Sequence, residues 1–344
     1  MRTVVIHAAK DLRIEERAIE PLGPGQVAVR IEAGGICGSD LHYYQHGGFG
    51  TVRIREPMIL GHEVAGEVIS VGAAVTQVRP GDRVAINPSL PCGHCRYCLD
   101  GKPNHCLDMR FNGSAMRMPH MQGLFREITV CTEAQAVRVK PDSPLEVVAF
   151  AEPLSVCLHA ARQAGPLQGR RVLVTGAGPI GVLCAMVARH AGARQVVVTD
   201  IADAPLAVAR DVAADLALNT RDDPRALDRF AADKGWFDAV FECSGAGPAL
   251  AGAIQVARPG ATIVQVGLGG GDTSVPMNAV VAKELTLRGT FRFHEEFDCA
   301  VEFLDKGTID VRSLLTEVVP LEDAVRAFDL AGDRSRAMKV QLAL

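Results

Sequence analysis

Between residues 170 and 290 the sequence alternates short β-branched runs with alanine-rich segments of helical periodicity. The runs RVLVTG, QVVVTD and FDAVFECSG are typical of buried strands, whereas PIGVLCAMVARHAG and PALAGAIQVA are typical of helices. This alternation predicts a parallel sheet with helices on both faces, because parallel neighbours need long, usually helical, crossovers. It therefore constrains this part of the chain to a doubly wound α/β fold.

A glycine-rich segment follows the first of these strands. Gly176, Gly178 and Gly181 form a G-x-G-x-x-G pattern between RVLVT and the next helix. Glycines at these positions let the backbone approach a pyrophosphate, which the N–H groups of the helix N-terminus bind. Asp200 ends the following strand, where a carboxylate accepts hydrogen bonds from ribose hydroxyls and repels a 2′-phosphate. The pattern predicts bound NAD, preferred over NADP; the alternative is a loop that only packs helix against strand.

The rest of the chain has a different texture. Residues 1–140 contain short β-rich segments, such as QVAVRIEAGG and VAGEVISVG, separated by glycine and proline. The C-terminal tail supplies helical pieces and a last strand, MKVQLAL, but is too short to be a domain. We therefore expect residues 1–150 and 296–344 to form one β-rich domain. Residues 151–295 would then be an inserted doubly wound domain, with the substrate in the cleft between the two.

Composition excludes several classes of protein. The 344 residues are enough for two domains, and the net charge of −4 argues against binding to nucleic acid or anionic membranes. No stretch approaches the roughly 18 apolar residues of a spanning helix, and the N-terminus lacks the apolar core of a signal peptide. We expect a cytoplasmic protein that acts on a small molecule, with neither a nucleic-acid nor a membrane partner.

Four of the ten cysteines fall within fifteen residues, at Cys92, Cys95, Cys98 and Cys106. Tetrahedral zinc binds four soft ligands, and four thiolates close its coordination shell and leave no position for chemistry. The spacing predicts a structural zinc site. The alternatives are an iron–sulfur cluster, reduced core thiols, or a nucleic-acid-binding zinc ribbon, which the acidic net charge disfavours. The other scattered cysteines are typical of small buried side chains.

A second group of possible ligands is spread along the sequence. Cys37 lies in GICGSDLH, His62 and Glu63 follow an apolar run, and Glu152 precedes the doubly wound region. Together these residues offer sulfur, nitrogen and oxygen ligands, a combination that can hold zinc with one position left open. A Lewis-acidic zinc makes an alcohol more acidic, which favours hydride loss to NAD.

These motifs belong to longer stretches that resemble the zinc-containing medium-chain alcohol and polyol dehydrogenases. The stretches include GGICGSDLHYYQ, GHEVAGEVISVG, PCGHCRYC, AEPLSVCLHA, GAGPIG and TFRF, and the resemblance covers essentially the whole chain. It implies a GroES-like β-rich catalytic domain and a Rossmann NAD-binding domain. It also implies one catalytic and one structural zinc ion, and a homo-oligomer that is a tetramer rather than a dimer.

The resemblance assigns roles to individual residues. Cys37 and His62 match ligands of the catalytic zinc, and either Glu63 or Glu152 matches the remaining protein ligand. The positions that match contacts to the cofactor are Gly176, Gly178, Pro179, Ile180, Gly181, Asp200, Val266, Gly267, Thr290, Phe291 and Arg292.

Further matches concern the substrate. Ser39 matches the hydroxyl that takes the alcohol proton, and His42 matches a relay residue leading toward the ribose and solvent. Tyr43 and Arg292 match residues of the substrate pocket.

Within the family, DMRFNGSAM and the C-terminal AGDRSRAMKVQLAL resemble members that oxidise L-idonate to 5-keto-D-gluconate. The planar fork of arginine suits the carboxylate of this substrate, so Arg110 and Arg292 are candidates to bind it. Each arginine could instead pair with an acidic neighbour on the surface. Three alternative functions stay open at this point: a sorbitol or xylitol dehydrogenase, an L-threonine 3-dehydrogenase, and a non-catalytic relative that binds zinc and NAD.

Overall fold

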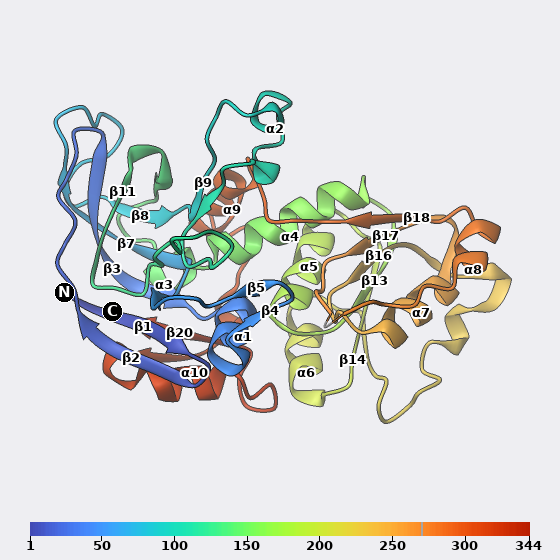
Figure 1. Cartoon of the computed structure of the whole chain (residues 1–344). Coiled ribbons are helices and arrows are strands. Elements are labelled where there is room, and N and C mark those ends of the chain that lie inside the picture. The colour runs from blue at the N-terminus through green and yellow to red at the C-terminus, as the bar shows by residue number, and fades with distance from the viewer. Residues whose placement is uncertain (270) are drawn as a thin grey trace. The chain divides into compact units, whose positions relative to one another are not determined.

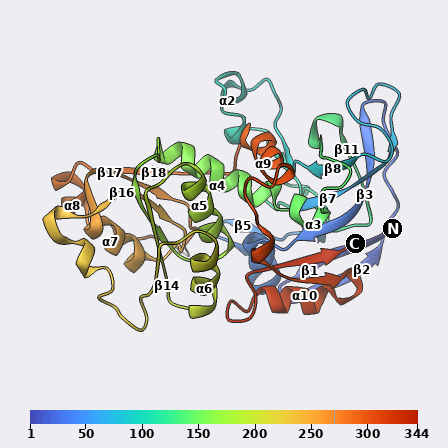
Figure 2. The ribbon, with the colours of Figure 1, turned by 180° about the vertical axis from the view of Figure 1, so that it is seen from behind.

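The computed structural model describes residues 1–269 and 271–344, and the chain divides into two compact units. Unit 1 comprises Met1–Glu152, His294–Asp333 and Lys339–Leu344, and unit 2 comprises Pro153–Phe293 and Arg334–Met338. Figures 1 and 2 show the ribbon from opposite sides. Among the described residues, no helix has both the length and the apolar character needed to cross a membrane.

Unit 2 contains a six-stranded parallel sheet in the order β15-β14-β13-β16-β17-β18. Its strands are β13 (Arg171–Thr175), β14 (Gln195–Asp200), β15 (Leu216–Asn219), β16 (Phe237–Glu242), β17 (Ala257–Gln265) and β18 (Thr286–Gly289). Its helices are α4 (Ala151–Ala164, which begins in unit 1), α5 (Pro179–His190), α6 (Asp203–Val212), α7 (Gly247–Val256) and α8 (Met277–Ala282). The chain thus starts at a central strand and winds outward in both directions, which is the order of a dinucleotide-binding sheet.

The helices of unit 2 cover both faces of this sheet. Helices α5 and α6 contact β13, β14 and β15, whereas α7 contacts β13, β16 and β17. Because parallel crossovers are right-handed, winding outward in opposite directions puts these two sets of helices on opposite faces (Figures 1 and 2). Val172, Leu173 and Val174 of the central strand are therefore buried on both sides. The predicted α/β class is confirmed.

The turn between β13 and α5 needs its glycines for close packing. Gly176 has a φ of +89°, in the left-handed region that favours glycine. A Cβ atom on Gly181 would lie 1.8 Å from the carbonyl oxygen of Gly176, so any side chain there would displace the turn. Gly178 precedes the helix, and Pro179 occupies its first turn, where the missing N–H removes no helical hydrogen bond.

Unit 1 is built on a seven-stranded sheet in the order β12-β8-β7-β3-β20-β19, with β11 also pairing with β3. These strands are β3 (Gln26–Gly35), β7 (Glu63–Val71), β8 (Arg83–Ile86), β11 (Ile128–Thr132), β12 (Ala136–Arg138), β19 (Leu315–Pro320) and β20 (Lys339–Ala343). Smaller sheets contain β1 (Arg2–Ala8), β2 (Asp11–Glu16) and β6 (Met58–Ile59), β4 (Gly48–Phe49) and β5 (Val52–Arg53), and β9 (Ser89–Leu90) and β10 (Arg110–Phe111). The helices are α1 (Gly38–His46), α2 (Arg96–Leu99), α3 (Leu145–Val148), α9 (Glu296–Asp305) and α10 (Ala324–Ala331).

The register around β3 brings distant parts of the sequence together. Gly35, at the end of β3, lies opposite Glu63 of β7 on one side and Gln341 of β20 on the other. The C-terminal strand therefore lies two strands from the GHE segment, although almost 280 residues separate them in the sequence.

The contact at Gly181 predicts a specific cost of substitution. We expect Gly181→Ala to lower the free energy of unfolding by about 1–3 kcal/mol, the usual penalty for overpacking, because the new methyl group meets a backbone carbonyl. Gly178→Ala is the matched control, since a Cβ there meets nothing within 4 Å. Urea denaturation of both variants measures the difference, and equal stabilities would contradict this account of the turn.

Candidate functional site

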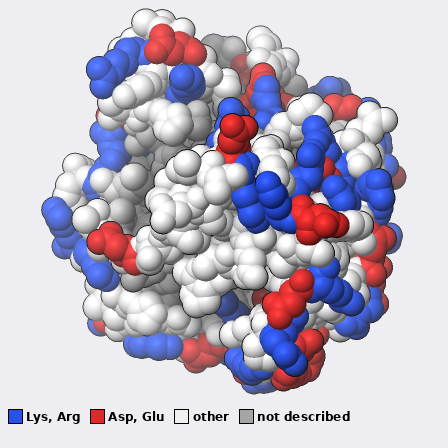
Figure 3. All heavy atoms as spheres, turned by 90° about the vertical axis from the view of Figure 1, so that its right-hand side faces the viewer, with Lys and Arg blue, Asp and Glu red and all other residues white. Residues whose placement is uncertain are grey.

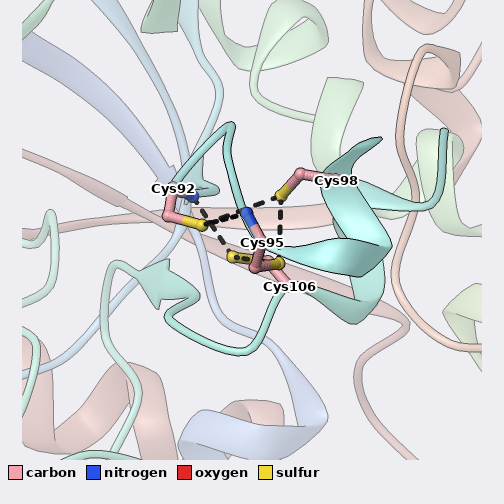
Figure 4. A group of neighbouring side chains, drawn as sticks. All are labelled: Cys92, Cys95, Cys98 and Cys106. Carbon is pink, nitrogen blue, oxygen red and sulfur yellow. Dashed lines mark hydrogen bonds between the residues drawn. The ribbon is translucent and has the colours of Figure 1, made fainter. Parts of the chain in front are cut away.

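The four clustered cysteines converge in space in unit 1. Their sulfur atoms all lie within 4.8 Å of one another (Figure 4). The Sγ–Sγ distances are 3.6 Å for Cys95–Cys98, 3.9 Å for Cys95–Cys106 and 4.0 Å for Cys92–Cys98. Sulfur atoms bonded to one tetrahedral zinc at about 2.3 Å are separated by about 3.8 Å, whereas a disulfide needs about 2.05 Å. The donor set therefore fits a zinc ion, and all four thiols are free.

Backbone N–H groups surround these sulfur atoms. Cys92 N–H donates to Cys106 Sγ at 3.2 Å, and Cys95 N–H donates to Cys92 Sγ at 3.3 Å. Hydrogen bonds from backbone groups, first that of Leu107, lower the pKa of Cys95 to about 6. Desolvation instead raises the pKa of Cys98 to about 12. A loop that already points N–H groups at sulfur is suited to thiolates bound to a metal.

A second group of donors lies at the ends of β3 and β7. Cys37 Sγ, a ring nitrogen of His62 and a carboxylate oxygen of Glu63 lie within 4.8 Å of one another. Cys37 directly precedes α1, His62 directly precedes β7 and Glu63 begins it, so two strand ends and a helix start bring them together. His62 Nδ1 is buried and has no hydrogen-bond partner among the described residues. A thiol, an imidazole nitrogen and a carboxylate that converge in this way are a good fit to zinc.

The electrostatics of this group reflect several acids in a dry environment. Burial, together with the negative charge of Glu63, raises the pKa of Cys37 to about 12. Burial likewise raises the pKa of Glu152 to about 8, and His62 opposes that rise while Glu63 and Cys37 add to it. Glu152 is thus close enough to feel these charges, although it is not in the group of three donors that converge within 4.8 Å. A bound dication reverses these shifts, because metal ligands must be deprotonated.

Two further charged residues complete the surroundings. Asp40 is fully buried, accepts the N–H groups of Cys37 at 3.0 Å and Gly61 at 3.2 Å, and lies 3.7 Å from His62 Nδ1. Burial raises the pKa of Asp40. Lys339 of β20 is also buried and forms an ion pair with Glu63. Although burial lowers the pKa of Lys339, the charges of Glu63 and Cys37 raise it above its ordinary value.

The remaining residues predicted in this region lie on or near α1. Ser39 is half-buried in the first turn, and His42 is exposed, with its ring facing His46 and Phe49. Tyr43 is buried, and its hydroxyl accepts the N–H of Ala115 at 3.0 Å, so it anchors the loop after β10.

The two predicted carboxylate-binding arginines occupy different units. Arg110, in unit 1, is exposed and makes no ion pair with any described residue, and its neighbour Phe111 packs against the ring of His62 at 5.6 Å. Arg292, in unit 2, has a φ of +55° and its guanidinium lies over the ring of Phe291, 5.0 Å from the ring centroid.

The predicted dinucleotide residues gather at the carboxyl edge of the parallel sheet in unit 2. Asp200 Oδ2 accepts the N–H of Ala177 at 2.6 Å, and its Oδ1 accepts the N–H groups of Ile201 at 2.7 Å and Ala202 at 3.0 Å. The carboxylate therefore joins the end of β14 to the glycine-rich loop. Pro179 and Ile180 begin α5, and Gly181 packs beneath the loop.

A buried glutamate fixes the neighbouring strand ends. Glu242, at the end of β16, accepts hydrogen bonds from Thr175 Oγ1 at 3.2 Å, Ser244 N–H at 2.9 Å and Gly245 N–H at 3.0 Å. Its backbone carbonyl accepts the N–H groups of Val266 and Gly267.

Two polar atoms near this edge have no partner. Thr290 Oγ1 and Gln265 Oε1 are buried without a hydrogen-bond partner among the described residues. Unpaired buried polar atoms are costly, so they mark a place where a polar ligand would be accommodated. The edge therefore fits a dinucleotide.

Comparison with known proteins assigns the family. The model of the alcohol dehydrogenase GroES-like domain matches residues 23–142, and that of the zinc-binding dehydrogenase matches residues 179–306. The chain is 42% identical over 341 residues to L-idonate 5-dehydrogenase (NAD(P)(+)) of Escherichia coli K12, covering 99% of this chain and 98% of that protein. It is 35% identical to sorbitol dehydrogenase of Gallus gallus, covering 98% of this chain and 95% of that protein.

Solved structures agree with these matches. The crystal structure of E. coli L-idonate 5-dehydrogenase aligns with a TM-score of 0.96, covering 100% of this chain and 98% of that one, at 42% identity. E. coli galactitol-1-phosphate dehydrogenase aligns with a TM-score of 0.89 at 28% identity, covering 100% of both chains. The chain therefore belongs to the zinc-dependent medium-chain alcohol dehydrogenases, a family of oxidoreductases that bind zinc and NAD(P).

Sequence reasoning missed three residues that shape these sites. Asp40 appeared only as part of a motif, although an acid three residues after the cysteine that precedes a helix is a capping signal. Lys339 is a lysine within the apolar strand MKVQLAL, and that pattern could have marked it as a buried cation. Glu242 lies near the carboxyl end of the predicted strand FDAVFECSG. Because ligands bind at the carboxyl ends of parallel strands, that position could have marked it as a site residue.

The thiol cluster predicts a stability that depends on metal. We expect Cys95→Ser to lose one equivalent of zinc and to unfold well before the parent protein, because a structural zinc contributes directly to folding free energy. Cys131→Ser is the matched control, since Cys131 is a buried thiol on β11 outside the cluster and should leave the zinc content unchanged. Elemental analysis and thermal unfolding measure both effects. Full zinc content in Cys95→Ser would contradict the assignment.

Proposed function

We propose that this protein oxidises the C5 hydroxyl of L-idonate to the ketone, giving 5-keto-D-gluconate, with NAD as the hydride acceptor. The identity of 42% to L-idonate 5-dehydrogenase, against 35–36% to sorbitol dehydrogenases, supports this substrate over a neutral polyol. A sorbitol- or xylitol-type polyol dehydrogenase is the second candidate, because those relatives also match along nearly the whole chain.

We assign the chemistry to the group formed by Cys37, His62 and Glu63 in unit 1, of which His62 and Glu63 are buried and Cys37 is half-buried. Cys37 and His62, with Glu63 or Glu152, would hold the catalytic zinc, and the cluster of four cysteines would hold the structural one. The observation that carries this assignment is the convergence of a sulfur, a nitrogen and an oxygen donor, all within 4.8 Å of one another. Zinc, when bound, supplies Lewis acidity toward the alcohol oxygen, and NAD supplies the hydride acceptor.

The residues of α1 handle the proton in this proposal. Ser39 takes the proton of the substrate hydroxyl, and His42 passes it toward solvent, for which its exposed position is suitable. Asp40 holds His62 and the start of α1 in place through its contacts to Cys37 and Gly61.

The edge of the sheet in unit 2 binds the dinucleotide in this proposal. The glycine-rich loop would hold the pyrophosphate, and Asp200 would bind the ribose hydroxyls and so favour NAD over NADP. The other contacts would come from Val266, Gly267, Thr290, Phe291 and Arg292. Residues 151–295 thus act as the dinucleotide-binding domain, and residues 1–150 and 296–344 as the catalytic domain.

We propose Arg110 or Arg292 as the group that binds the substrate carboxylate. Arg110 is supported by its exposure, its lack of an ion-pair partner among the described residues, and its place next to Phe111, which packs on His62. Tyr43 would act indirectly, since its buried hydroxyl holds the loop that follows Arg110.

We also propose a homo-oligomer, a tetramer rather than a dimer, in the cytoplasm. The edge strand β18 has four exposed residues and pairs only with β17 in the described part of the chain. Met277 and Val281 of the neighbouring α8 are exposed too, and the side of the molecule that carries α8 shows a broad area without charged groups (Figure 3). An unprotected edge next to apolar surface favours association with a second copy.

The substrate proposal predicts a charge-dependent preference. We expect NADH formation to be faster with L-idonate than with sorbitol, xylitol or L-threonine. Arg110→Ala or Arg292→Ala should raise KM for L-idonate about 10- to 100-fold, since a hydrogen bond to a charged group contributes about 1.5–3 kcal/mol, and should barely change KM for sorbitol. Arg117→Ala is the matched control, because Arg117 already pairs with Asp108 at 2.5 Å. Faster turnover of sorbitol with no effect of either arginine would assign the protein to the polyol enzymes.

Cofactor preference should depend on Asp200. We expect Asp200→Ser combined with Ile201→Arg to shift the ratio of kcat/KM values toward NADP by about 10- to 100-fold, the effect of gaining a charged hydrogen bond and losing a repulsive carboxylate. Ile201 is exposed, so the arginine has room, and Ile201→Arg alone is the control. The assignment fails if the parent protein already prefers NADP.

A further inference from the structure

Lys339 is a buried cation at the start of a mostly apolar strand. It begins β20, it is 4% exposed, and its neighbours Val340 and Leu342 are fully buried. Its ammonium group forms an ion pair with Glu63 Oε2 and donates a hydrogen bond to the carbonyl oxygen of Ile36 at 3.1 Å. Both partners are adjacent to candidate ligands, since Ile36 precedes Cys37 and Glu63 follows His62.

The sheet is shaped to allow this pair. Strands β7, β3 and β20 are neighbours, and Gly35 of β3 lies between Glu63 and the start of β20. A Cβ atom on Gly35 would lie 2.2 Å from Glu63 Oε2, so only glycine leaves space for the carboxylate to cross β3 and reach the lysine. The ion pair is therefore built into the register of three strands.

Packing alone does not account for a lysine here. Desolvating an ammonium group costs several kcal/mol, and apolar residues of similar volume usually stabilise a core at least as well as a buried ion pair does. The ion pair instead directs the charge of Lys339 chiefly toward Glu63, a carboxylate of the candidate metal site. A metal ion and Lys339 would therefore share Glu63.

We propose that Lys339 is a positioning residue that holds one oxygen of Glu63 and competes with the zinc ion for that carboxylate. This inference rests on the proposed catalytic zinc site. By keeping Glu63 a weak and displaceable ligand, Lys339 maintains one coordination position for the alcohol. A tightly bound Glu63 carboxylate would add negative charge to a zinc ion that the Cys37 thiolate already binds, and would reduce its Lewis acidity. By holding Glu63, Lys339 preserves that Lewis acidity.

The test is the rate at which zinc leaves the intact protein for a colorimetric chelator. Release from the two sites is resolved by variants, because Cys95→Ser removes the phase of the cysteine cluster and His62→Ala removes the other. We expect Lys339→Met to slow the second phase about tenfold or more, the scale on which residues next to ligands alter metal affinity, and to lower kcat. Lys339→Arg, which keeps the charge, should release zinc as the parent does.

Two comparisons separate this role from a structural one. Lys306→Met removes the lysine of an exposed ion pair with Glu302 on α9 and should change neither phase. In the background of Glu63→Gln, adding Lys339→Met should have no further effect, because the carboxylate for which Lys339 competes is gone. Lys339→Met alone leaves the carboxylate of Glu63 buried without its cation, which could prevent folding. The double variant has no such carboxylate, so its comparison with Glu63→Gln provides the test in that case.

Unchanged or faster zinc release in Lys339→Met would overturn the inference, because loss of packing loosens a site whereas loss of a competing cation tightens it. An effect of Lys339→Met that persists in the Glu63→Gln background would also overturn it. Failure of the proposed function would give a different result. The parent protein would then lack the second phase of zinc release, the phase that His62→Ala is expected to remove.

Discussion

The arrangement of unit 1 depends on how the negative charges around Cys37, His62 and Glu63 are neutralised in the protein interior. Four acidic groups and an imidazole share one poorly exposed region of unit 1. Cys37 is half-buried there, and Asp40, His62, Glu63 and Glu152 are buried. Burial raises the pKa values of Cys37 and Glu152, which favours their protonated forms over the anionic forms that bind a metal. In our proposal, a divalent cation would make the same burial favourable for anionic ligands, while Lys339 offsets the charge of Glu63 alone. The pairing of β7, β3 and β20 is what brings the lysine, the glycine gap and the ligands together.

Unit 2 meets a different constraint, which is to satisfy polar groups at the edge of a parallel sheet. Asp200 and Glu242 each accept backbone N–H groups from loops that follow strand ends, so the carboxylates hold those loops in a fixed shape. The loops are tight enough that Gly181 tolerates no side chain. Thr290 and Gln265 keep unpaired atoms at the same edge. A rigid edge with a few unsatisfied polar atoms is suited to bind a polar cofactor without large rearrangement.

Sequence patterns were sufficient for the features that repeat or cluster locally. The alternation of strands and helices predicted the parallel sheet, and the predicted strand QVAVRIEAGG coincides with β3. The close spacing of Cys92, Cys95, Cys98 and Cys106 predicted their convergence. The Lys339–Glu63 ion pair could not be predicted in this way, because it depends on which strands are neighbours in a mixed sheet, and sequence periodicity does not encode strand order. The choice between Glu63 and Glu152 as third ligand stayed open because both match positions that the family uses variably. Both are buried here, and Glu63 is the one grouped with Cys37 and His62 within 4.8 Å.

We propose that unit 1 holds a catalytic metal ion at Cys37 and His62, separate from the cysteine cluster. Anomalous X-ray diffraction at the zinc absorption edge, from crystals of the parent protein, locates every bound zinc ion. We expect two peaks per chain. One would lie among the four clustered sulfur atoms, and the other about 2.3 Å from Cys37 Sγ and about 2.0–2.1 Å from a nitrogen of His62. A single peak at the cysteine cluster, with Cys37 and His62 free of metal, would contradict it.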